Sequence, residues 1–369
     1  MKNILCVVGT RPEAIKMAPV ILASRKQPWA NVRVLATAQH REMLDQVFDL
    51  FDITPDMDLN IMQENQTLPE LTARLMTSLD QAFRCEDPDA VLAQGDTSTV
   101  MVAALASFYR RIPFGHVEAG LRTGDLAYPF PEEMNRVVTG RLARWHFAPT
   151  ESARTNLRAE GIGDERIFVT GNTVIDALLD VAKRCDEYAP KVSPGKRLVL
   201  VTAHRRENFG DPFGEICRAI RYLADSRSDV EFLYPVHPNP NVREVARNML
   251  GRHPRIQLCD PLDYLPFVAA MKTAYFILSD SGGVQEEAPA LGKPVLVLRR
   301  ETERPEAVKE GVVKLVGPDF DAIVKESLQL LDDDRAYSAM ARGISPYGDG
   351  LASLRIVEIL GKELSCIAA

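Results

Sequence analysis

Residues 279–287, Ser-Asp-Ser-Gly-Gly-Val-Gln-Glu-Glu, decide the fold class of this chain. They follow an apolar run at residues 274–278 and lead into a segment compatible with a helix that ends near Leu291. A strand, a glycine turn and the start of a helix direct free backbone N–H groups and the positive end of the helix dipole toward one point. This pattern predicts a seat for a diphosphate.

Gly282 and Gly283 also have a simpler interpretation, because a tight turn between a strand and a helix is common in any α/β protein. Glu287 favours the ligand-binding interpretation. It lies one helical turn beyond Gly283 and can accept hydrogen bonds from ribose hydroxyls while the amides hold phosphates. A phosphate seat beside a ribose acceptor indicates a nucleotide.

The composition bounds the class of protein. A chain of 369 residues is comfortable for two domains and therefore predicts a cleft between them. With 46% hydrophobic and 26% charged residues, it has the composition of a soluble globular protein. The net charge of −7 and the dispersed Lys and Arg residues argue against a nucleic-acid partner. The 6 cysteines form no C-x-x-C pair, so neither a disulfide framework nor a zinc ribbon is indicated.

The N-terminal apolar run, residues 4–8, is short and is soon followed by Arg11 and Glu13. We therefore interpret it as the first strand and not as a signal peptide. No uninterrupted apolar stretch approaches the roughly 18 residues of a membrane-spanning helix. We expect a cytoplasmic protein with no membrane partner.

Short β-branched runs alternate with longer amphipathic stretches, which is the pattern of βαβ units. In the first half, these runs are residues 4–8, 32–36, 90–93 and 113–117. In the second half, they are residues 198–201, 231–235, 256–258, 274–278 and 294–298. A charged, proline-bearing interval at 186–196 separates the halves and indicates a domain border nearby. We predict an α/β fold with a parallel sheet covered by helices in each half.

Polar clusters follow the predicted strands at their carboxyl ends, where open parallel sheets place ligands. In the first half, they are residues 9–13 (GTRPE), 94–97 (QGDT) and 116–122 (HVEAGLR). We expect Asp96 and Glu118 to converge on one cleft. Glu132 and Glu133 begin a later helix, where Glu133 fits ordinary complementarity with the helix dipole. We expect Glu132 to lie in the same cleft as Asp96 and Glu118. Clustered carboxylates raise one another's pKa into a range useful for catalysis, so this interpretation is favoured over helix-dipole complementarity for Glu132.

Two histidines follow strands of the second half. His204 lies in residues 202–208 (TAHRREN), and His237 lies in residues 235–238 (PVHP). A lone histidine is usually structural, but two at strand ends beside arginines favour contacts to a phosphorylated ligand or a proton donor to it. Other motifs are absent from the sequence: no G-x-G-x-x-G follows the first strand, and no P-loop occurs. Bound NAD is therefore not indicated.

Five motifs together carry a family resemblance. They are residues 9–16 (GTRPEAIK), 95–97 (GDT), 116–124 (HVEAGLRTG), 204–207 (HRRE) and 281–287 (SGGVQEE). With them the chain closely resembles the non-hydrolysing UDP-N-acetylglucosamine 2-epimerases of bacteria. The resemblance runs from the first strand to residues 346–350 (PYGDG), which is essentially the whole chain, and its motifs are specific as a set.

The resemblance implies a glycosyltransferase-B-like fold, with two Rossmann-like domains and parallel sheets around a central cleft, usually in a homodimer. We place the N-terminal domain at residues 1–171, with a C-terminal helix at about 351–369 crossing back to it, and the UDP-binding domain at 172–350. The implied reaction is reversible C2 epimerisation of UDP-N-acetylglucosamine to UDP-N-acetylmannosamine. It proceeds by anti elimination of UDP to 2-acetamidoglucal and syn readdition, needs no cofactor and no metal, and supplies N-acetylmannosamine for bacterial surface polysaccharides.

The resemblance also implies roles for individual residues. The family's catalytic carboxylates match Asp96, Glu118 and Glu132, and the histidine that assists the departing UDP matches His204. Which carboxylate takes the C2 proton stays open. The substrate-binding positions match Arg11, Lys16, Phe267, Ser281, Gly282, Gly283 and Glu287. A second UDP-N-acetylglucosamine, bound as an activator, has contacts that match Gln39, Arg206 and His237.

Three alternatives share this architecture. A hydrolysing epimerase would release free N-acetylmannosamine and UDP. A glycosyltransferase would need a separate acceptor. A nucleotide-sugar-binding protein would have lost the chemistry altogether, which the cluster of Asp96, Glu118, Glu132 and His204 argues against.

Overall fold

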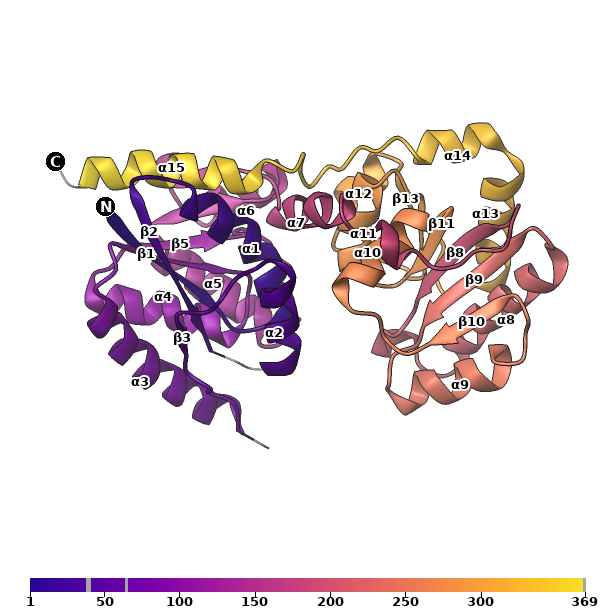
Figure 1. Cartoon of the computed structure of the whole chain (residues 1–369), viewed down its shortest axis with the longest axis horizontal. Coiled ribbons are helices and arrows are strands. Elements are labelled where there is room, and N and C mark those ends of the chain that lie inside the picture. The colour runs from indigo at the N-terminus through magenta and orange to yellow at the C-terminus, as the bar shows by residue number, and fades with distance from the viewer. Residues whose placement is uncertain (38–40, 64–65, 368–369) are drawn as a thin grey trace. The chain divides into compact units, whose positions relative to one another are not determined.

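The computed structural model describes residues 1–37, 41–63 and 66–367. The chain divides into two compact units (Figure 1). Unit 1 comprises Met1–Ala177 and the C-terminal stretch from Tyr347, and unit 2 comprises Leu178–Pro346. The first border therefore falls inside a helix, α7 (Thr173–Ala182), and not in the proline-bearing interval at 186–196.

Within the described residues of unit 1, seven parallel strands form a sheet in the order β3-β2-β1-β4-β5-β6-β7. The strands are β1 (Lys2–Val8), β2 (Ala30–Ala36), β3 (Met57–Asp58), β4 (Ala90–Gln94), β5 (Phe114–Val117), β6 (Trp145–Ala148) and β7 (Ile167–Val169). The helices are α1 (Arg11–Arg25), α2 (Arg41–Leu50), α3 (Leu68–Glu86), α4 (Ser98–Arg110), α5 (Glu132–Leu142), α6 (Glu151–Ala159), the α7 helix and α15 (Ala352–Ile367). α1 and α15 pack together on one side of the sheet, and α3 packs on α4 on the other.

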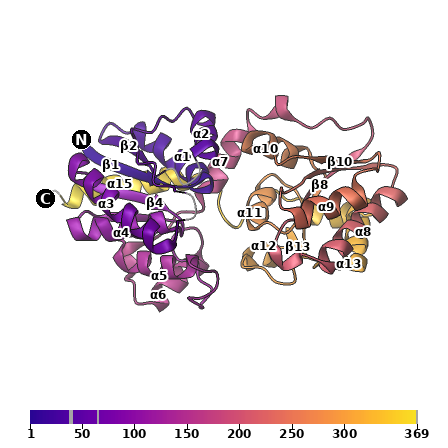
Figure 2. The same cartoon turned by 90° about the horizontal axis from the view of Figure 1, so that it is seen from below.

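Unit 2 contains a second sheet, whose described strands are all parallel in the order β10-β9-β8-β11-β12-β13. The strands are β8 (Arg197–Thr202), β9 (Val230–Pro235), β10 (Ile256–Cys259), β11 (Phe276–Ser279), β12 (Val295–Val297) and β13 (Val313–Leu315). The helices are α8 (Asp211–Ser226), α9 (Pro240–Leu250), α10 (Tyr264–Thr273), α11 (Gly282–Ala290), α12 (Pro305–Lys309), α13 (Phe320–Asp332) and α14 (Asp334–Met340). α8 packs with α9 and α13, and α11 packs with α12 (Figure 2).

Continuous apolar strands explain the parallel arrangement. In β1 every residue from Ile4 to Val8 is buried, as expected for a strand whose two faces are both covered by helices. Ile4 pairs with Val32 on one side and with Ala90 on the other. The predicted α/β class, with a parallel sheet in each half, is confirmed. No helix in the described part of the chain is long and apolar enough to cross a membrane.

The helices that follow β1 and β4 each begin after a threonine that caps the helix N-terminus. Thr10 caps α1, and the carboxylate of Glu13 accepts a hydrogen bond from the N–H of Thr10, which completes a capping box. Thr97 caps α4 through its side chain, which accepts a hydrogen bond from the N–H of Val100. These caps end each strand abruptly, so that the residues between strand and helix are held at the edge of the sheet.

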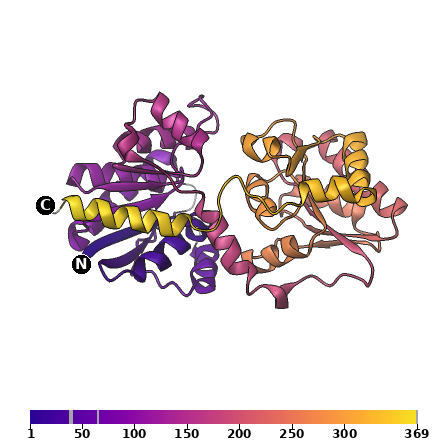
Figure 3. The ribbon, with the colours of Figure 1, turned by 90° about the horizontal axis from the view of Figure 1, so that it is seen from above.

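The C-terminal helix α15, the yellow helix that leads to the C-terminus in Figure 3, packs on α1 within unit 1. Asp176 of α7 anchors the first residues of this helix. Asp176 accepts hydrogen bonds from the N–H of Ala352 at 3.2 Å, from the N–H of Ser353 at 2.8 Å and from the hydroxyl of Ser353 at 2.6 Å. A buried carboxylate therefore satisfies the first N–H groups of the helix and complements its dipole.

Asp176→Ala is expected to lower the free energy of unfolding by about 2–3 kcal/mol, because it leaves buried donors of α15 without their acceptor. Urea unfolding measures this loss, and limited proteolysis should cut the variant first near residues 351–367. Asp180→Ala is the control, since Asp180 lies on the same helix but is exposed, with Oδ2 3.3 Å from Arg184 Nη2. An equal, small effect of the two substitutions would contradict the anchoring role.

Candidate active site

The carboxyl ends of three neighbouring strands carry the polar clusters of unit 1. β1, β4 and β5 are adjacent in the sheet, and they are followed by Gly9, Asp96 and Glu118 respectively. Gly9 has to be a glycine, because a Cβ there would lie 2.7 Å from the hydroxyl of Thr99 and 2.8 Å from that of Thr37. The close approach lets α1 begin directly after β1, with Arg11 half-buried as its first residue.

Glu118 is held by its backbone and by its side chain. Its φ of +64° lies in the left-handed region, which costs a non-glycine residue on the order of 1 kcal/mol. Lys16 Nζ lies 2.6 Å from Oε1, and Asn172 Nδ2 donates to the same oxygen at 2.8 Å. Gln94 Nε2 donates to Oε2. Both carboxylate oxygens are therefore fixed in direction, and the side chain is largely buried.

Asp96 is joined to α5 through Arg136. The guanidinium Nη2 of Arg136 lies 2.7 Å from Asp96 Oδ2, and Asn135 Nδ2 donates to the backbone carbonyl of Asp96 at 2.8 Å. Glu132 is the first residue of α5 and is half-buried, one helical turn before Arg136. The structure thus connects Asp96 to the helix that carries Glu132.

Glu133 does more than complement the dipole of α5, contrary to the sequence-based interpretation. It is buried, and its Oε1 accepts hydrogen bonds from the N–H groups of Thr123 at 2.9 Å and Gly124 at 3.1 Å. Its Oε2 accepts from Arg136 Nη1 at 3.0 Å. Glu133 therefore orders the loop after β5 and orients the arginine that contacts Asp96.

Two buried titratable groups, Glu13 and His116, contact the backbone that follows β1 and β4. Glu13 accepts hydrogen bonds from the N–H groups of Gly9 at 2.6 Å and Thr10 at 3.2 Å. Burial raises the pKa of Glu13 to about 7, and these hydrogen bonds oppose the rise. Burial lowers the pKa of His116 to about 4, so its neutral ring contacts the carbonyl of Gly95 at 2.7 Å, directly before Asp96.

In unit 2, His204 and His237 stack on each other at the ends of β8 and β9. Their ring centroids are 5.4 Å apart, with 15° between the ring planes. The buried carboxylate of Asp280 accepts from the N–H of His204 at 2.9 Å and from that of Arg205 at 2.8 Å, and its second oxygen lies 3.7 Å from His204 Nδ1. Burial lowers the pKa of His204, and the charge of Asp280 opposes this effect.

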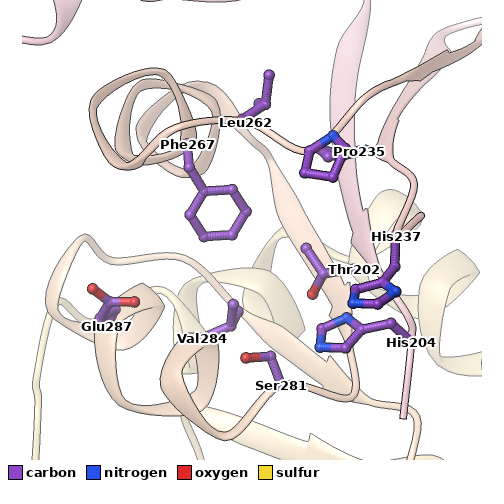
Figure 4. A pocket seen from close by; sticks show the side chains of 10 residues that line it. Thr202, His204, Pro235, His237, Leu262, Phe267, Ser281, Val284 and Glu287 are labelled. Atoms are coloured by element: carbon purple, nitrogen blue, oxygen red, sulfur yellow. The ribbon is translucent and has the colours of Figure 1, made fainter. Parts of the chain in front are cut away.

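The stacked histidines line a cavity of about 190 Å³ in unit 2 (Figure 4). Its lining residues are Thr202, His204, Pro235, His237, Pro261, Leu262, Phe267, Ser281, Val284 and Glu287. His204 and His237 lie at one end and Glu287 at the other, with Phe267 facing the space between them. The hydroxyl of Tyr264 donates to Glu287 Oε1 at 2.9 Å and fixes this acceptor.

α11 begins at this cavity. Ser281 precedes the helix and lines the cavity, and Gly282 and Gly283 form its first turn. A Cβ at Gly282 would lie 2.9 Å from the guanidinium carbon of Arg304, so a side chain there would displace a cation from the helix start. The N-terminus of α11 therefore combines the positive end of a helix dipole, backbone N–H groups and a neighbouring guanidinium, which together suit an anion.

The residues expected at a second ligand have different positions. His237 lines the cavity beside His204. Arg206 is exposed and begins a short 3-10 turn at Arg206–Asn208. Gln39 lies outside the described residues. In the described ranges, no group of three His, Cys, Asp or Glu side chains could hold a metal ion.

Sequence reasoning missed five residues that hold the site: Gln94, Glu133, Arg136, Asn172 and Asp280. Each acts on a residue far away in the sequence or on the backbone, so no local motif identifies its role. Asp280 offered one signal, since a carboxylate beside a glycine turn at a strand end is well placed to accept backbone N–H groups.

Glu13→Gln is expected to become more stable relative to the unsubstituted protein as the pH rises. The folded-state pKa of Glu13 is raised from 4.5 to about 7, so the stability linked to its protonated form is fully present below pH 4.5 and is lost as the pH rises through about 7. The neutral amide loses nothing in this window. Urea unfolding of both proteins at about pH 5 and about pH 8 measures the difference.

Glu70→Gln is the matched control, because Glu70 occupies the same place in the capping box of α3 but is exposed. Hydrogen bonds from Thr67 lower the pKa of Glu70, so its contribution is lost as the pH falls and not as it rises. A stability difference at Glu13 that stays constant or reverses between the two pH values would contradict the buried, raised carboxyl.

Comparison with known proteins agrees with this geometry. A sequence profile described as "UDP-N-acetylglucosamine 2-epimerase" matches residues 22–361. The UDP-N-acetylglucosamine 2-epimerase of Escherichia coli K12 is 55% identical over 97% of this chain and 98% of its own length. The crystal structure of UDP-GlcNAc 2-epimerase from Neisseria meningitidis bound to UDP-GlcNAc is 49% identical, covers 98% of this chain and 100% of its own, and superimposes with a TM-score of 0.89.

A glycosyltransferase of kitacinnamycin, 12% identical with a TM-score of 0.68 over 98% of this chain and 99% of its own, shares the fold alone. The profile matches residues 22–361, and the epimerases of Escherichia coli and Neisseria meningitidis each match 97–98% of this chain. On this evidence, the chain belongs to the UDP-N-acetylglucosamine 2-epimerase family.

Proposed function

We propose that the chain interconverts UDP-N-acetylglucosamine and UDP-N-acetylmannosamine without hydrolysis, by elimination and readdition of UDP. The observation that carries the proposal is the carboxylate of Glu118, which is fixed at both oxygens at the end of β5. A carboxylate held in this way is prepared to exchange a proton with a carbon acid at a defined point. Binding of UDP alone would not require it.

The cavity of unit 2 supports UDP as the leaving group. The start of α11 suits the diphosphate, Glu287 suits the ribose hydroxyls, and Phe267 suits the uracil ring. The related structure from Neisseria meningitidis is described as bound to UDP-GlcNAc. In our proposal Arg11 and Lys16 of unit 1 add positive charge toward the same substrate.

The chemistry explains why carboxylates and phosphate-binding groups are both needed. The hydrogen at C2 of the sugar is not adjacent to a carbonyl and is only weakly acidic, so its removal has to accompany departure of UDP. A carboxylate takes the C2 proton, the C2–H electrons form the C1–C2 double bond, and the C1–O electrons leave with UDP. The amides of α11 and His204 stabilise the charge that grows on the diphosphate.

Epimerisation then requires a proton at C2 from the opposite face as UDP adds back. In our proposal one group serves each face of C2, so the reaction uses a second group that can donate a proton. Asp96, Glu118 and Glu132 fill these roles in our proposal.

Further parts of the proposal concern the protein in the cell. We infer that the protein acts as a cytoplasmic homodimer and that its product supplies N-acetylmannosamine units for surface polysaccharide. A second UDP-N-acetylglucosamine would activate it through Gln39, Arg206 and His237. The stacking of His237 on His204 supports this role, because a ligand at His237 would contact the ring that faces the departing UDP.

Incubation with UDP-N-acetylglucosamine alone tests the function. We expect UDP-N-acetylmannosamine as the product, measured by NMR or anion-exchange chromatography. Free N-acetylmannosamine and UDP accumulating in step with turnover would indicate the hydrolysing enzyme instead. No conversion without an acceptor would contradict the epimerase and favour a glycosyltransferase or a binding protein.

Asp96→Asn is expected to keep the fold and UDP binding but to lower kcat by about a thousandfold or more, as for removal of a principal catalytic group. Calorimetric titration with UDP and the coupled epimerase assay measure the two properties. Asp80→Asn is the matched control, because Asp80 also pairs with an arginine, Arg110 Nε at 2.6 Å, but lies on α3 with its side chain 47% exposed. Near-normal turnover of Asp96→Asn would overturn its assignment.

A further inference from the structure

The backbone of Asn172 joins the two segments that connect unit 1 to the rest of the chain. The chain leaves unit 1 after Ala177 and returns at Tyr347. The N–H of Asn172 donates to the carbonyl of Tyr347 at 2.6 Å. Gly171 has a φ of +90°, and a Cβ there would lie 3.4 Å from Cα of Gly348. The outgoing and returning segments therefore touch, with glycines at the contact, directly before α7 begins.

The side chain of Asn172 is buried, with 2% exposed, and its orientation is fixed. Its Oδ1 accepts from the N–H of Val174 at 3.1 Å, and its Nδ2 donates to Glu118 Oε1 at 2.8 Å. Exchanging the two amide atoms would place an oxygen against the carboxylate and an NH2 group against an N–H. The hydrogen bonds therefore admit one orientation, with the donor toward Glu118.

Glu118 receives hydrogen bonds from three parts of unit 1. Lys16 belongs to α1, Gln94 is the last residue of β4, and Asn172 lies in the outgoing segment. Of these three donors, Asn172 is the one whose own backbone is bonded to the returning segment. The direction of the carboxylate is thus linked through Asn172 to both connecting segments.

We propose that Asn172 is a positioning residue for Glu118 and couples the direction of this carboxylate to the connecting segments. The inference rests on the proposed function, in which Glu118 exchanges a proton at C2. A base has to direct a lone pair at the hydrogen it removes, and a small misplacement lowers the rate steeply. A shift of the returning segment at Tyr347 is transmitted to Glu118 through Asn172. The position of this segment therefore affects the direction of the Glu118 carboxylate, and with it the rate of proton transfer.

Two substitutions separate positioning from a structural role. Asn172→Ala removes both side-chain hydrogen bonds. Asn172→Asp keeps an acceptor for the N–H of Val174, and with it the start of α7, but turns a carboxylate oxygen toward Glu118. A purely structural role predicts that Asn172→Asp restores what Asn172→Ala loses. A positioning role predicts that Asn172→Asp is the worse enzyme, because like charges repel at this distance.

The experiment measures kcat and KM for UDP-N-acetylglucosamine at about pH 9, because burial and the neighbouring Glu118 raise the pKa of the introduced aspartate and its charge develops most fully at high pH. We expect Asn172→Ala to lower kcat about ten- to a hundredfold, as for loss of a hydrogen bond to a charged group, with KM changed by less than about threefold. We expect Asn172→Asp to lower kcat further. UDP binding, measured by calorimetry, should stay within about twofold of the unsubstituted protein in both variants, because neither variant replaces a residue proposed to bind UDP.

Asn156→Ala is the matched control. Asn156 Nδ2 donates to the carbonyl of Gly120 at 3.0 Å, so the substitution removes an amide from the loop after Glu118 without touching its carboxylate. Its kcat is expected to stay within about twofold of the unsubstituted value. An equal loss in Asn156→Ala and Asn172→Ala would show that any damage to this loop lowers the rate, and would overturn the inference.

The outcomes distinguish the inference from the proposed function. If the unsubstituted protein forms no UDP-N-acetylmannosamine, the proposed function fails and the inference fails with it. If the unsubstituted protein is active and Asn172→Asp matches or exceeds Asn172→Ala, the inference alone is overturned. Should Asn172→Ala not fold, the loss of kcat in the folded Asn172→Asp variant, set against Asn156→Ala, decides the question.

Discussion

The parallel pairing of β1, β4 and β5 fixes where the reactive groups of unit 1 can lie. Parallel strands end at the same edge of a sheet, so the residues that follow them are neighbours however far apart they are in the sequence. β1 pairs with β4 from Ile4 to Val7, and β4 pairs with β5 up to Gln94 and Val117. The same constraint operates in unit 2, where β8, β9 and β11 bring His204, His237 and the start of α11 to one cavity.

Buried carboxylates convert these edges into fixed sites. A charge removed from water is costly unless hydrogen bonds replace the lost hydration, so each buried carboxylate binds whatever donors surround it. Glu133 orders the loop at Thr123 and Gly124, and Asp280 orders the loop that begins at His204. The proposed reaction uses neither of these two carboxylates directly. Asp280 holds the backbone of His204, and Glu133 holds the loop that follows Glu118.

The parallel sheets were predictable because buried strands are continuous apolar runs, whereas several other features depend on contacts between distant residues. The two-residue strand β3 and the three-residue strands β7 and β13 are too short to show a pattern. The border inside α7 has no loop composition, so the proline-bearing interval at 186–196 indicates only its neighbourhood. The bond from Asn172 to Glu118 spans 54 residues, and the bond from Asp280 to His204 spans 76, so their roles follow only from the folded chain.

The central claim is that cleavage of the C1–O bond is coupled to exchange of the proton at C2. Incubation of the unsubstituted protein with UDP-N-acetylglucosamine in deuterium oxide, followed by NMR of both recovered UDP-sugars, tests it directly. We expect deuterium at C2 of the UDP-N-acetylmannosamine formed, because the proton returned to C2 comes from a carboxyl group in exchange with solvent. Isomerisation with the original hydrogen fully retained at C2 would contradict it.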